Sequence, residues 1–343
     1  MTKTSTPRIG FACKWIDRPD QINNIKPKDE CKRLNTSTTT VAWLNRQTPD
    51  VAVQKLWDLM KFNIESIRLL IEKVGTLNEH LRMVRLGSDL LPVYTHADWS
   101  WFWRQPDVRC YAESAFGQVG RRARELGVRL SFHPGQFCVL ASASEGIVVR
   151  SVEEFEYHAD MARWMGYGQT FQDLKINVHI SGKRGPQGIR DILGKLSPEA
   201  RNCITIENEE NAWGLDDCLT ISDIVPIVLD VHHHWCREGV YIDPASDSVK
   251  RVVDSWRGVR PTMHYSISRE DVLVDHCPDT LPDMSVLKST GYNKQKLRAH
   301  SDYYWNSAVN SWAAGFSPQF DIMSESKGKN LASQKFANYV LGL

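Results

Sequence analysis

The chain has 343 residues, of which 42% are hydrophobic and 24% are charged, the proportions of a globular protein with a large core. The formal net charge is only +1, which excludes a strongly basic chain, so any basic surface must be local. The eight cysteines contain no Cys-x-x-Cys pair, and no apolar run reaches transmembrane length. These features favour a reduced cytoplasmic protein with one large α/β domain or two smaller ones.

Short apolar stretches that are typical of buried strands recur along the whole chain. They cover residues 8–13, 83–89, 128–133, 174–180, 203–208, 227–235, 261–266 and 317–325. Segments with helical periodicity lie between them, at residues 50–74, 107–126, 144–165, 189–196, 216–222, 247–256, 298–312 and from 330 onward. Residues 1–7 are expected to be a frayed polar leader, and residues 14–49 and 268–296 to be long polar insertions.

Eight strands that alternate with helices indicate a parallel sheet. Eight such units suit a closed (β/α)8 barrel, in which side chains at the carboxyl ends of the strands meet at one mouth. We therefore predict an α/β fold, a TIM barrel with a single domain over residues 8–343. A doubly wound sheet is the alternative, but it would not bring the ends of all the strands to one point.

A histidine or an acidic residue stands at or near the carboxyl end of nearly every predicted strand. The clearest case is IVLDVHHHW at residues 227–235, where an apolar run leads into Asp230 and three histidines. Burying these groups is costly unless a cation lies among them, so we predict Asp230 and His233 as metal ligands. The full candidate set is His96, His133, His179, Glu207, Asp230, His233, His264, His300 and Glu325.

This set of side chains indicates which metals could bind. Imidazole and carboxylate groups without thiolates suit Zn²⁺, Mn²⁺ or Fe²⁺. Nine ligands are too many for one ion, which takes about four to six, so we predict two or three ions bridged by carboxylates. Such a cluster would generate a metal-bound hydroxide near neutral pH and stabilise the charges that develop in phosphodiester hydrolysis.

Any single histidine at a strand end is more often a hydrogen-bonded structural residue, so the metal hypothesis rests on the whole set. His96 and His300 are its weakest members, because one lies in a loop and the other in a predicted helix. In an extended strand His232 and His234 would point away from His233, and they would then either support a ligand or only pack.

Aromatic and basic residues follow several strand ends and suit contacts with nucleic acid. The run Trp99, Trp101, Phe102, Trp103 and Arg104 offers rings that can stack on bases and a cation for phosphate. The alternative is that two of the three tryptophans pack against the barrel and hold this loop on its surface. Further candidates at the rim are Gln136, Phe137, Lys183, Arg184, Lys327 and Lys329.

Motifs spread in order over nearly the whole chain resemble the UV damage endonuclease family. They are RIGFAC, VRLGSDLLP with THAD, SFHPGQF, NVHISG, ITIENEE, LDVHHH, MHYS, AHSDYYW and DIMSESKGK. The resemblance implies a metal-dependent TIM barrel related to endonuclease IV-type AP endonucleases, with two or three divalent ions, most often Mn²⁺, while Zn²⁺ is also compatible. It also implies damaged double-stranded DNA as the partner, nicked immediately 5′ to cyclobutane dimers and 6-4 photoproducts.

On this resemblance the nine candidate ligands take the metal positions of the family. Glu207, Glu325 and His233 are predicted to be catalytic, with the two glutamates as bridging carboxylates. Gln136 and Phe137 are expected to fill the space opposite an extruded lesion.

The chain departs from the family pattern at three positions. Phe137 and Phe11, which is also a predicted lesion contact, stand where the family usually has tyrosine, so stacking is kept and a hydroxyl is lost. Thr262 stands where members often carry a lysine near the metals, which bears on the exact metal geometry.

Three other functions stay open from the residues alone. A general AP endonuclease would use the same side chains. A metal-dependent sugar isomerase would need a small closed pocket, and a non-enzymatic DNA-binding barrel would not need so many ligands. We expect a monomer in the cytoplasm, without membrane contact, that associates with the nucleoid when it binds DNA.

Overall fold

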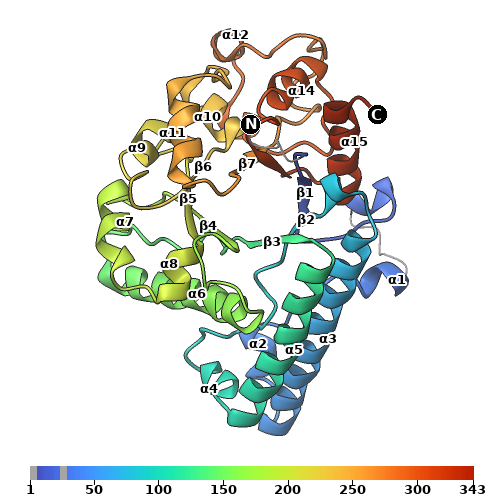
Figure 1. The fold of residues 1–343 in the computed structure, drawn as a ribbon, viewed down its shortest axis with the longest axis vertical. Helices are drawn as coiled ribbons and strands as arrows, with labels where there is room; N and C mark the ends of the chain where they lie inside the picture. The colour runs from blue at the N-terminus through green and yellow to red at the C-terminus, as the bar shows by residue number, and fades with distance from the viewer. Residues whose placement is uncertain (1–5, 24–28) are drawn as a thin grey trace.

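The computed structural model describes residues 6–23 and 29–343, so most of the predicted leader lies outside the described residues. Eight parallel strands form one sheet in the order β6–β5–β4–β3–β2–β1–β8–β7. The strands are β1 (Ile9–Ala12), β2 (Met83–Arg85), β3 (Arg129–Phe132), β4 (Lys175–His179), β5 (Ile204–Glu207), β6 (Ile227–Val228), β7 (Thr262–Tyr265) and β8 (Asp321–Ser324). Helices surround this ring of strands (Figure 1). The predicted single-domain α/β TIM barrel is confirmed.

The barrel closes between β6 and β7 through a single bridge instead of a full ladder. Asp230 and His264 form an isolated parallel bridge, and the His264 N–H donates to the carbonyl oxygen of Leu229 at 3.0 Å. The strand β6 is short because a helix begins almost directly after it. The seam of the barrel therefore falls where two candidate ligands stand.

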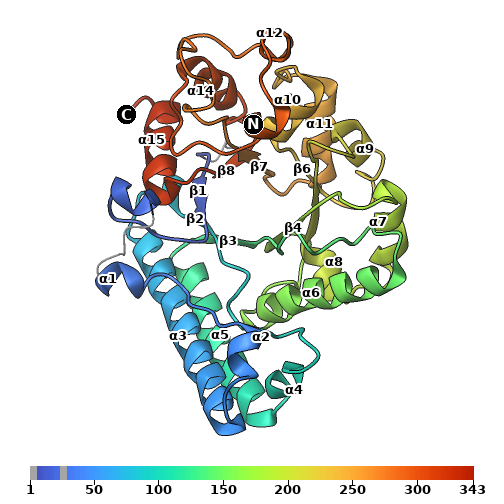
Figure 2. The same ribbon diagram turned by 180° about the vertical axis from the view of Figure 1, so that it is seen from behind.

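Three long helices agree with the predicted helical segments: α3 (Pro49–Gly75), α5 (Pro106–Glu125) and α6 (Glu145–Trp164). Both α3 and α5 begin with proline, whose missing N–H needs no partner in a first helical turn. Seen from behind, α3 and α5 run side by side, with the short helices α2 (Val41–Leu44) and α4 (Ser100–Trp103) at their far end (Figure 2).

The remaining helices are shorter and cover the rest of the barrel. They are α1 (Asp29–Lys32), α7 (Gly185–Leu193), α8 (Pro198–Cys203), α9 (Leu215–Leu219), α10 (Val231–Glu238), α11 (Asp247–Ser255), α12 (Met284–Ser289), α13 (Lys294–Leu297), α14 (Ser307–Ala314) and α15 (Lys329–Leu341). None of the helices in the described part of the chain has the length and apolar character needed to cross a membrane.

The prediction of a strand over residues 227–235 was wrong beyond its first residues. Only β6 is extended, and the three histidines lie in the first turns of α10. Asp230 is the N-cap, and its side chain accepts a hydrogen bond from the backbone N–H of His233 at 2.7 Å. This cap satisfies a helix-start donor and favours the helix over a longer strand.

The predicted helix over residues 298–312 was also wrong in its first half. Helix α14 begins only at Ser307, where the Asn306 side chain accepts from the Val309 N–H at 2.8 Å. His300 instead forms an isolated antiparallel bridge with Ser268. His300 is therefore positioned by contacts with the segment after β7 and not by a helix.

Both predicted insertions contain short helices. Residues 14–49 carry a 3-10 helix, η1 (Pro19–Asn23), together with α1 and α2, and residues 268–296 carry α12 and α13. A second 3-10 helix, η2 (Glu79–Leu81), precedes β2. The side-chain amide of Asn63, buried on α3, donates to the carbonyl oxygen of Ser37 at 2.8 Å, which ties the first insertion to the barrel.

An ion cluster closes the amino end of the barrel. The buried carboxylate of Asp321, at the start of β8, accepts from Arg129 Nη1 at 2.6 Å and from Arg260 Nε at 2.9 Å. It also accepts from the backbone N–H of Arg8, just before β1, at 2.8 Å. This end is filled by structural ion pairs, which leaves the carboxyl end for the functional site.

Candidate metal centre

Seven of the nine predicted ligands meet at the carboxyl end of the barrel. His179 ends β4 and stands beside Glu207, which ends β5, because these two residues are partners in the parallel register. The other five are His133 after β3, Asp230 and His233 at the start of α10, His264 in β7, and Glu325 after β8. Side chains separated by up to almost two hundred residues of sequence are thus neighbours.

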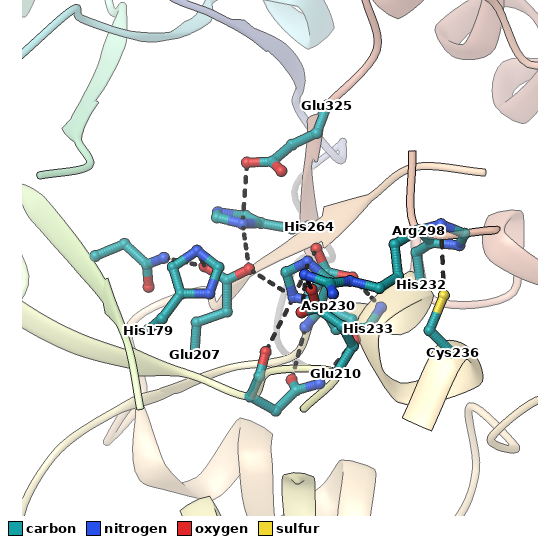
Figure 3. A network of polar contacts seen from close by, with 12 residues as sticks. His179, Glu207, Glu210, Asp230, His232, His233, Cys236, His264, Arg298 and Glu325 are labelled. Carbon is teal, nitrogen blue, oxygen red and sulfur yellow. Dashed lines mark hydrogen bonds and ion pairs between the residues drawn. The ribbon is translucent and has the colours of Figure 1, made fainter. Parts of the chain in front are cut away.

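Glu207 lies at the centre of this cluster, and its side chain is 1% exposed. Its Oε1 lies 3.1 Å from His264 Nδ1 and 3.4 Å from His233 Nδ1. Its Oε2 lies 3.3 Å from His133 Nε2 and 4.0 Å from His179 Nε2. Figure 3 shows Glu207 between His179 and His264. A carboxylate placed among four imidazoles in this way can bridge two ions.

Three overlapping groups of three residues have ligand atoms within 4.8 Å of one another. They are His133–Glu207–His264, His179–Glu207–His233 and Asp230–His264–Glu325. Glu207 and His264 each belong to two of these groups. A carboxylate can offer one oxygen to each of two ions, whereas one imidazole nitrogen serves one ion, so Glu207 is the residue that neighbouring ions would share.

Buried polar atoms in these groups lack the partners that burial normally requires. Glu207 Oε1, Asp230 Oδ2 and His264 Nδ1 are buried and have no partner in hydrogen-bond geometry among the described residues, although Glu207 Oε1 and His264 Nδ1 lie 3.1 Å apart. An unpaired buried polar atom is costly, and cations bound in the groups to which these three residues belong would satisfy these atoms. The residues present therefore fit a divalent metal centre.

Backbone and side-chain hydrogen bonds orient the ligands. The Asn208 side chain accepts from the Asp230 N–H at 2.9 Å and donates to the Asp230 carbonyl oxygen at 3.0 Å. The Asn208 carbonyl oxygen lies 3.0 Å from His233 Nδ1. Because a carbonyl only accepts, Nδ1 carries the hydrogen, and Nε2 of His233 is left as the ligand atom.

Three further polar residues support the cluster from inside the barrel. Asn177 donates to Glu207 Oε2 and is itself held by Thr205 Oγ1 at 2.8 Å. Lys175 is buried in β4, with its Nζ 2.8 Å from His264 Nε2. Arg85, at the end of β2, forms an ion pair with Glu325.

The electrostatics of the cluster divide the histidines into two classes. Burial lowers the pKa of His179 to about 4 and the pKa of His264 to about 4, so both rings are neutral at pH 7 and able to ligate. Burial alone would lower the pKa of His233, but Asp230, Glu207 and Glu210 together raise it to about 9. A metal that binds His233 must therefore displace a proton.

His96 and His300 lie outside the three groups. His96 is half exposed in the loop after β2, where its Nδ1 accepts from the Asp98 N–H at 3.2 Å. The ring centroid of His300 lies 6.1 Å from that of His232, which in turn stacks on Trp235. Their assignment as ligands stays a prediction. His232 packs under this region, with its Nε2 3.1 Å from the Leu297 carbonyl oxygen.

A family model described as UV-endonuclease UvdE matches residues 7–339. The chain belongs to this family. It is 24% identical to a UV-damage endonuclease of Schizosaccharomyces pombe over 95% of the chain and 49% of that protein, so it spans about half the length of this relative. It is 24% identical to a UV DNA damage endonuclease of Bacillus cereus strain 03BB102 over 90% of the chain and 89% of that protein.

Solved structures share the fold of this UvdE-family chain. The crystal structure of SacUVDE matches with a TM-score of 0.69 and 20% identity over 98% of each chain. Endonuclease IV from Thermus thermophilus matches with a TM-score of 0.50 and 13% identity over 80% of this chain and 94% of that chain. At these identities the two likenesses bear on the barrel fold alone.

The loop after β3 presents the most exposed aromatic ring of this UvdE-family member. Phe137 is 86% exposed, and the preceding Gln136 is also exposed. Phe11, in contrast, is 1% exposed and packs edge-to-face on Trp15 with centroids 5.8 Å apart. The expectation that Phe11 contacts a lesion is corrected, because its ring is covered by the core.

The aromatic residues after β2 fall into a buried pair and an exposed pair. This agrees with the alternative interpretation, in which two of the three tryptophans hold the loop on the barrel. Trp99 and Trp103 are buried, and their indole N–H groups donate to Asn45 Oδ1 at 2.8 Å and to the Pro92 carbonyl oxygen at 3.1 Å. These two rings fold the loop onto the protein. Trp101 is 44% exposed and Arg104 is exposed, so they are the members able to contact a ligand.

The predicted basic residues at the rim differ in their contacts. Lys183 and Arg184 are exposed after β4, and Arg184 pairs with Asp191. Lys327 pairs with Asp302 at 3.3 Å. Lys329 is half-buried at the start of α15. A phosphate that binds here would replace or share these ion pairs.

Sequence reasoning missed several residues that shape the centre. Lys175 interrupts an apolar strand, and a buried lysine needs a polar partner. Its position in the strand was therefore a signal that it contacts the centre. Glu210 and Arg298 form an ion pair beside His233. Glu210 follows Glu207 in the acidic run ENEE, but no pattern in the sequence shows that its side chain turns back to the barrel.

Proposed function

We propose that this chain is a DNA repair endonuclease that uses divalent ions, with Mn²⁺ as the first candidate and Zn²⁺ as the second, to hydrolyse the phosphodiester immediately 5′ to UV photoproducts. The observation that carries the proposal is the convergence of seven ligand-type side chains, with Glu207 among them, in a chain of the UvdE family. Divalent ions held there would activate water near neutral pH and neutralise charge on the phosphate.

The glutamates of the centre are the proposed bridging carboxylates. The two oxygens of Glu207 face different histidines, which suits a bridge between ions. Glu325 Oε1 lies 3.2 Å from His264 Nδ1, on the side away from Glu207 (Figure 3). Arg85 orients the Glu325 carboxylate, and the Asn208 carbonyl oxygen orients the His233 ring. The family resemblance keeps His96 and His300 in the proposed ligand set.

The rim is proposed to hold the damaged duplex. Gln136 and Phe137 would enter the gap left by an extruded dinucleotide, and extrusion costs little where a lesion already pairs poorly. Trp101 offers a face for stacking, and Arg104 with Lys183 can neutralise phosphates. Arg184, Lys327 and Lys329 would contribute once their present ion pairs or packing rearrange.

The test is nicking of UV-irradiated plasmid by the purified protein with Mn²⁺, with undamaged plasmid and an EDTA-treated sample alongside. An end-labelled duplex with one cyclobutane dimer maps the nick, and a duplex with one abasic site tests the broader AP endonuclease. Glu207→Gln should abolish nicking while binding to the damaged duplex persists. Glu113→Gln, on the exposed face of α5, is the matched control. Equal nicking of irradiated and undamaged plasmid would refute the proposal.

We also propose that the protein acts as a monomer in the cytoplasm and associates with the nucleoid when it is bound to DNA. Sedimentation of the purified protein measures its oligomeric state, and a dimer at assay concentration would contradict this part. A fluorescent fusion should move onto the chromosome after UV irradiation, and unchanged diffuse fluorescence would contradict the localisation.

A further inference from the structure

The insertion over residues 268–296 is a part of the chain to which the proposed function gives no role. It packs on α10 through a hydrophobic cluster separate from the main core, formed by Trp235, Cys236, Leu273, Met284, Leu287 and Leu297. The Ser268 hydroxyl donates to the Leu297 carbonyl oxygen at 2.6 Å, and the bridge between Ser268 and His300 ties the end of the segment to its beginning. The insertion is therefore a packed unit at the edge of the molecule, with α12 beyond α10 and α14 (Figure 1).

The strand order places this insertion across the mouth of the barrel from the loop that holds Gln136 and Phe137. That loop follows β3, and the insertion follows β7. Going round the barrel, β2, β1 and β8 separate these two strands on one side, and β4, β5 and β6 separate them on the other. A duplex with its lesion at Phe137 and its scissile phosphate at the metal centre therefore continues toward the insertion.

The two halves of the insertion region carry opposite charge. Residues 270–283 contain five acidic residues and no lysine or arginine, whereas residues 284–301 contain four basic residues and no acid. The four are Lys288, Lys294, Lys296 and Arg298. We call residues 284–301 the basic limb. Because the DNA backbone is negatively charged, the basic limb attracts it and the acidic half repels it.

The lysines of the basic limb are free to take up a phosphate. Among the described residues, none forms an ion pair or a side-chain hydrogen bond with Lys288, Lys294 or Lys296. Arg184 and Lys327 at the rim, in contrast, already pair with acidic side chains. A phosphate that binds an unpaired lysine does not have to break an existing ion pair, so the basic limb offers cations that need no rearrangement.

Helix α13 brings the basic limb up to the metal centre. Lys294 and Arg298 are four residues apart, about 6 Å along a helix, and so lie on one face of it. Arg298 forms an ion pair with Glu210, whose other oxygen lies 3.6 Å from His233 Nε2. Lys294 therefore stands about one helical turn outside the centre, on the face that carries Arg298.

The surface beside α13 is concave. A groove of about 540 Å³ is lined by Lys296 and Tyr292 and by the ion pair of Arg269 with Asp271. Lys296 is exposed at this groove. A sugar–phosphate strand that passes α13 can thus contact Lys294 on one side of the helix and Lys296 on another.

We propose that the basic limb binds backbone phosphates of the duplex that flanks the lesion, through Lys294 and Lys296, on the side of the mouth opposite Phe137. This inference rests on the proposed function for its substrate and adds a binding surface that none of the predicted site residues includes. The acidic half at residues 270–283 keeps the backbone on the basic limb. Contacts with phosphates carry no information about the lesion, so undamaged duplex is a valid probe of this surface.

The test is a fluorescence anisotropy titration of a labelled undamaged duplex at several salt concentrations, in buffer with Mn²⁺. Each phosphate contact contributes about 0.9 to the slope of log K against log salt concentration. The double variant Lys294→Gln with Lys296→Gln should therefore lower the slope by about 1.8 and weaken binding about 30-fold at about 0.15 M salt, the counterion-release factor relative to 1 M. The double variant Lys195→Gln with Lys250→Gln removes the same charge between α7 and α8 and on α11, and it should keep the wild-type slope.

Thermal melting shows that both double variants fold, because exchange of surface lysines for glutamine should leave the melting temperature unchanged. If the basic-limb variant keeps the wild-type slope, or if the control loses as much slope, the surface is overturned whether or not wild type nicks irradiated DNA. Failure of wild type to bind duplex DNA overturns it as well. If the basic-limb variant alone loses slope while wild type leaves irradiated plasmid intact, the surface stands and the proposed function fails.

Discussion

We predict that the buried, neutral side chain of His158 makes the free energy of unfolding depend on pH. This effect is separate from the metal centre. Its ring is fully buried on α6, beside Phe132 and Tyr157, and its Nδ1 donates to the Glu154 carbonyl oxygen at 2.7 Å. Burial lowers the pKa of His158 from 6.5 to about 4. Its Nε2 has no hydrogen-bond partner within the part of the chain that the structure describes, so a proton placed there has no acceptor.

The sign and size of the effect follow from this pKa difference. Between pH 4 and pH 6.5 the unfolded chain binds more protons at His158 than the folded chain, so stability rises with pH. At about 1.4 kcal/mol for each pH unit, this contribution is roughly 3 kcal/mol. It is fully present above pH 6.5 and is lost as the pH falls through the folded value of about 4.

The assay is urea unfolding of metal-free protein at pH 7 and pH 4. His158→Leu removes the titrating group, so its unfolding free energy should fall by roughly 3 kcal/mol less than that of wild type between these pH values. His276→Leu, a histidine in the segment after β7, is the control and should follow wild type. If His158→Leu and wild type lose the same stability on acidification, the reasoning about burial is refuted.

Two further predictions concern the ends of the barrel. Asp321→Asn leaves Arg129 and Arg260 without their shared carboxylate and should lower the unfolding free energy by about 3 kcal/mol, measured by urea titration. An unchanged midpoint would show that this ion cluster does not stabilise the closed barrel. Phe137→Ala should weaken binding to a dimer-containing duplex by about 1–3 kcal/mol in a fluorescence titration, with an unchanged melting temperature. Equal loss of affinity for undamaged duplex would contradict a role at the lesion.

The sequence predicted the barrel and most of the cluster for one physical reason. Parallel strands place their carboxyl ends at one edge, so histidines and acids that directly follow the strands gather at one mouth. Residues such as His179 and Glu207 depend only on this rule, and the register between β4 and β5 pairs them directly. Their placement required no knowledge of loop conformation.

The residues that sequence reasoning misplaced depend on interactions that no periodic pattern contains. The Asp230 cap turned an expected strand into α10 and gave His233 its place three residues into a helix start. His300 depends on its bridge with Ser268, across a long insertion. Phe11 has the same chemistry as Phe137, and only the packing of β1 against the core distinguishes a buried ring from an exposed one.

The loop after β5 shows how the centre gains groups that a strand cannot supply. A strand presents alternate side chains to one face, so β5 can direct Glu207 to the mouth of the barrel. A strand that continued straight beyond Glu207 would carry the following residues away from the mouth. The turn that begins at Glu209 reverses the chain and brings Glu210 back to His233. Arg298 reaches this carboxylate from beyond the 268–296 segment, so a change in that segment would alter the electrostatics beside His233 without touching any strand. The barrel therefore fixes the position of Glu207, while its loops decide which further charged side chains lie beside His233.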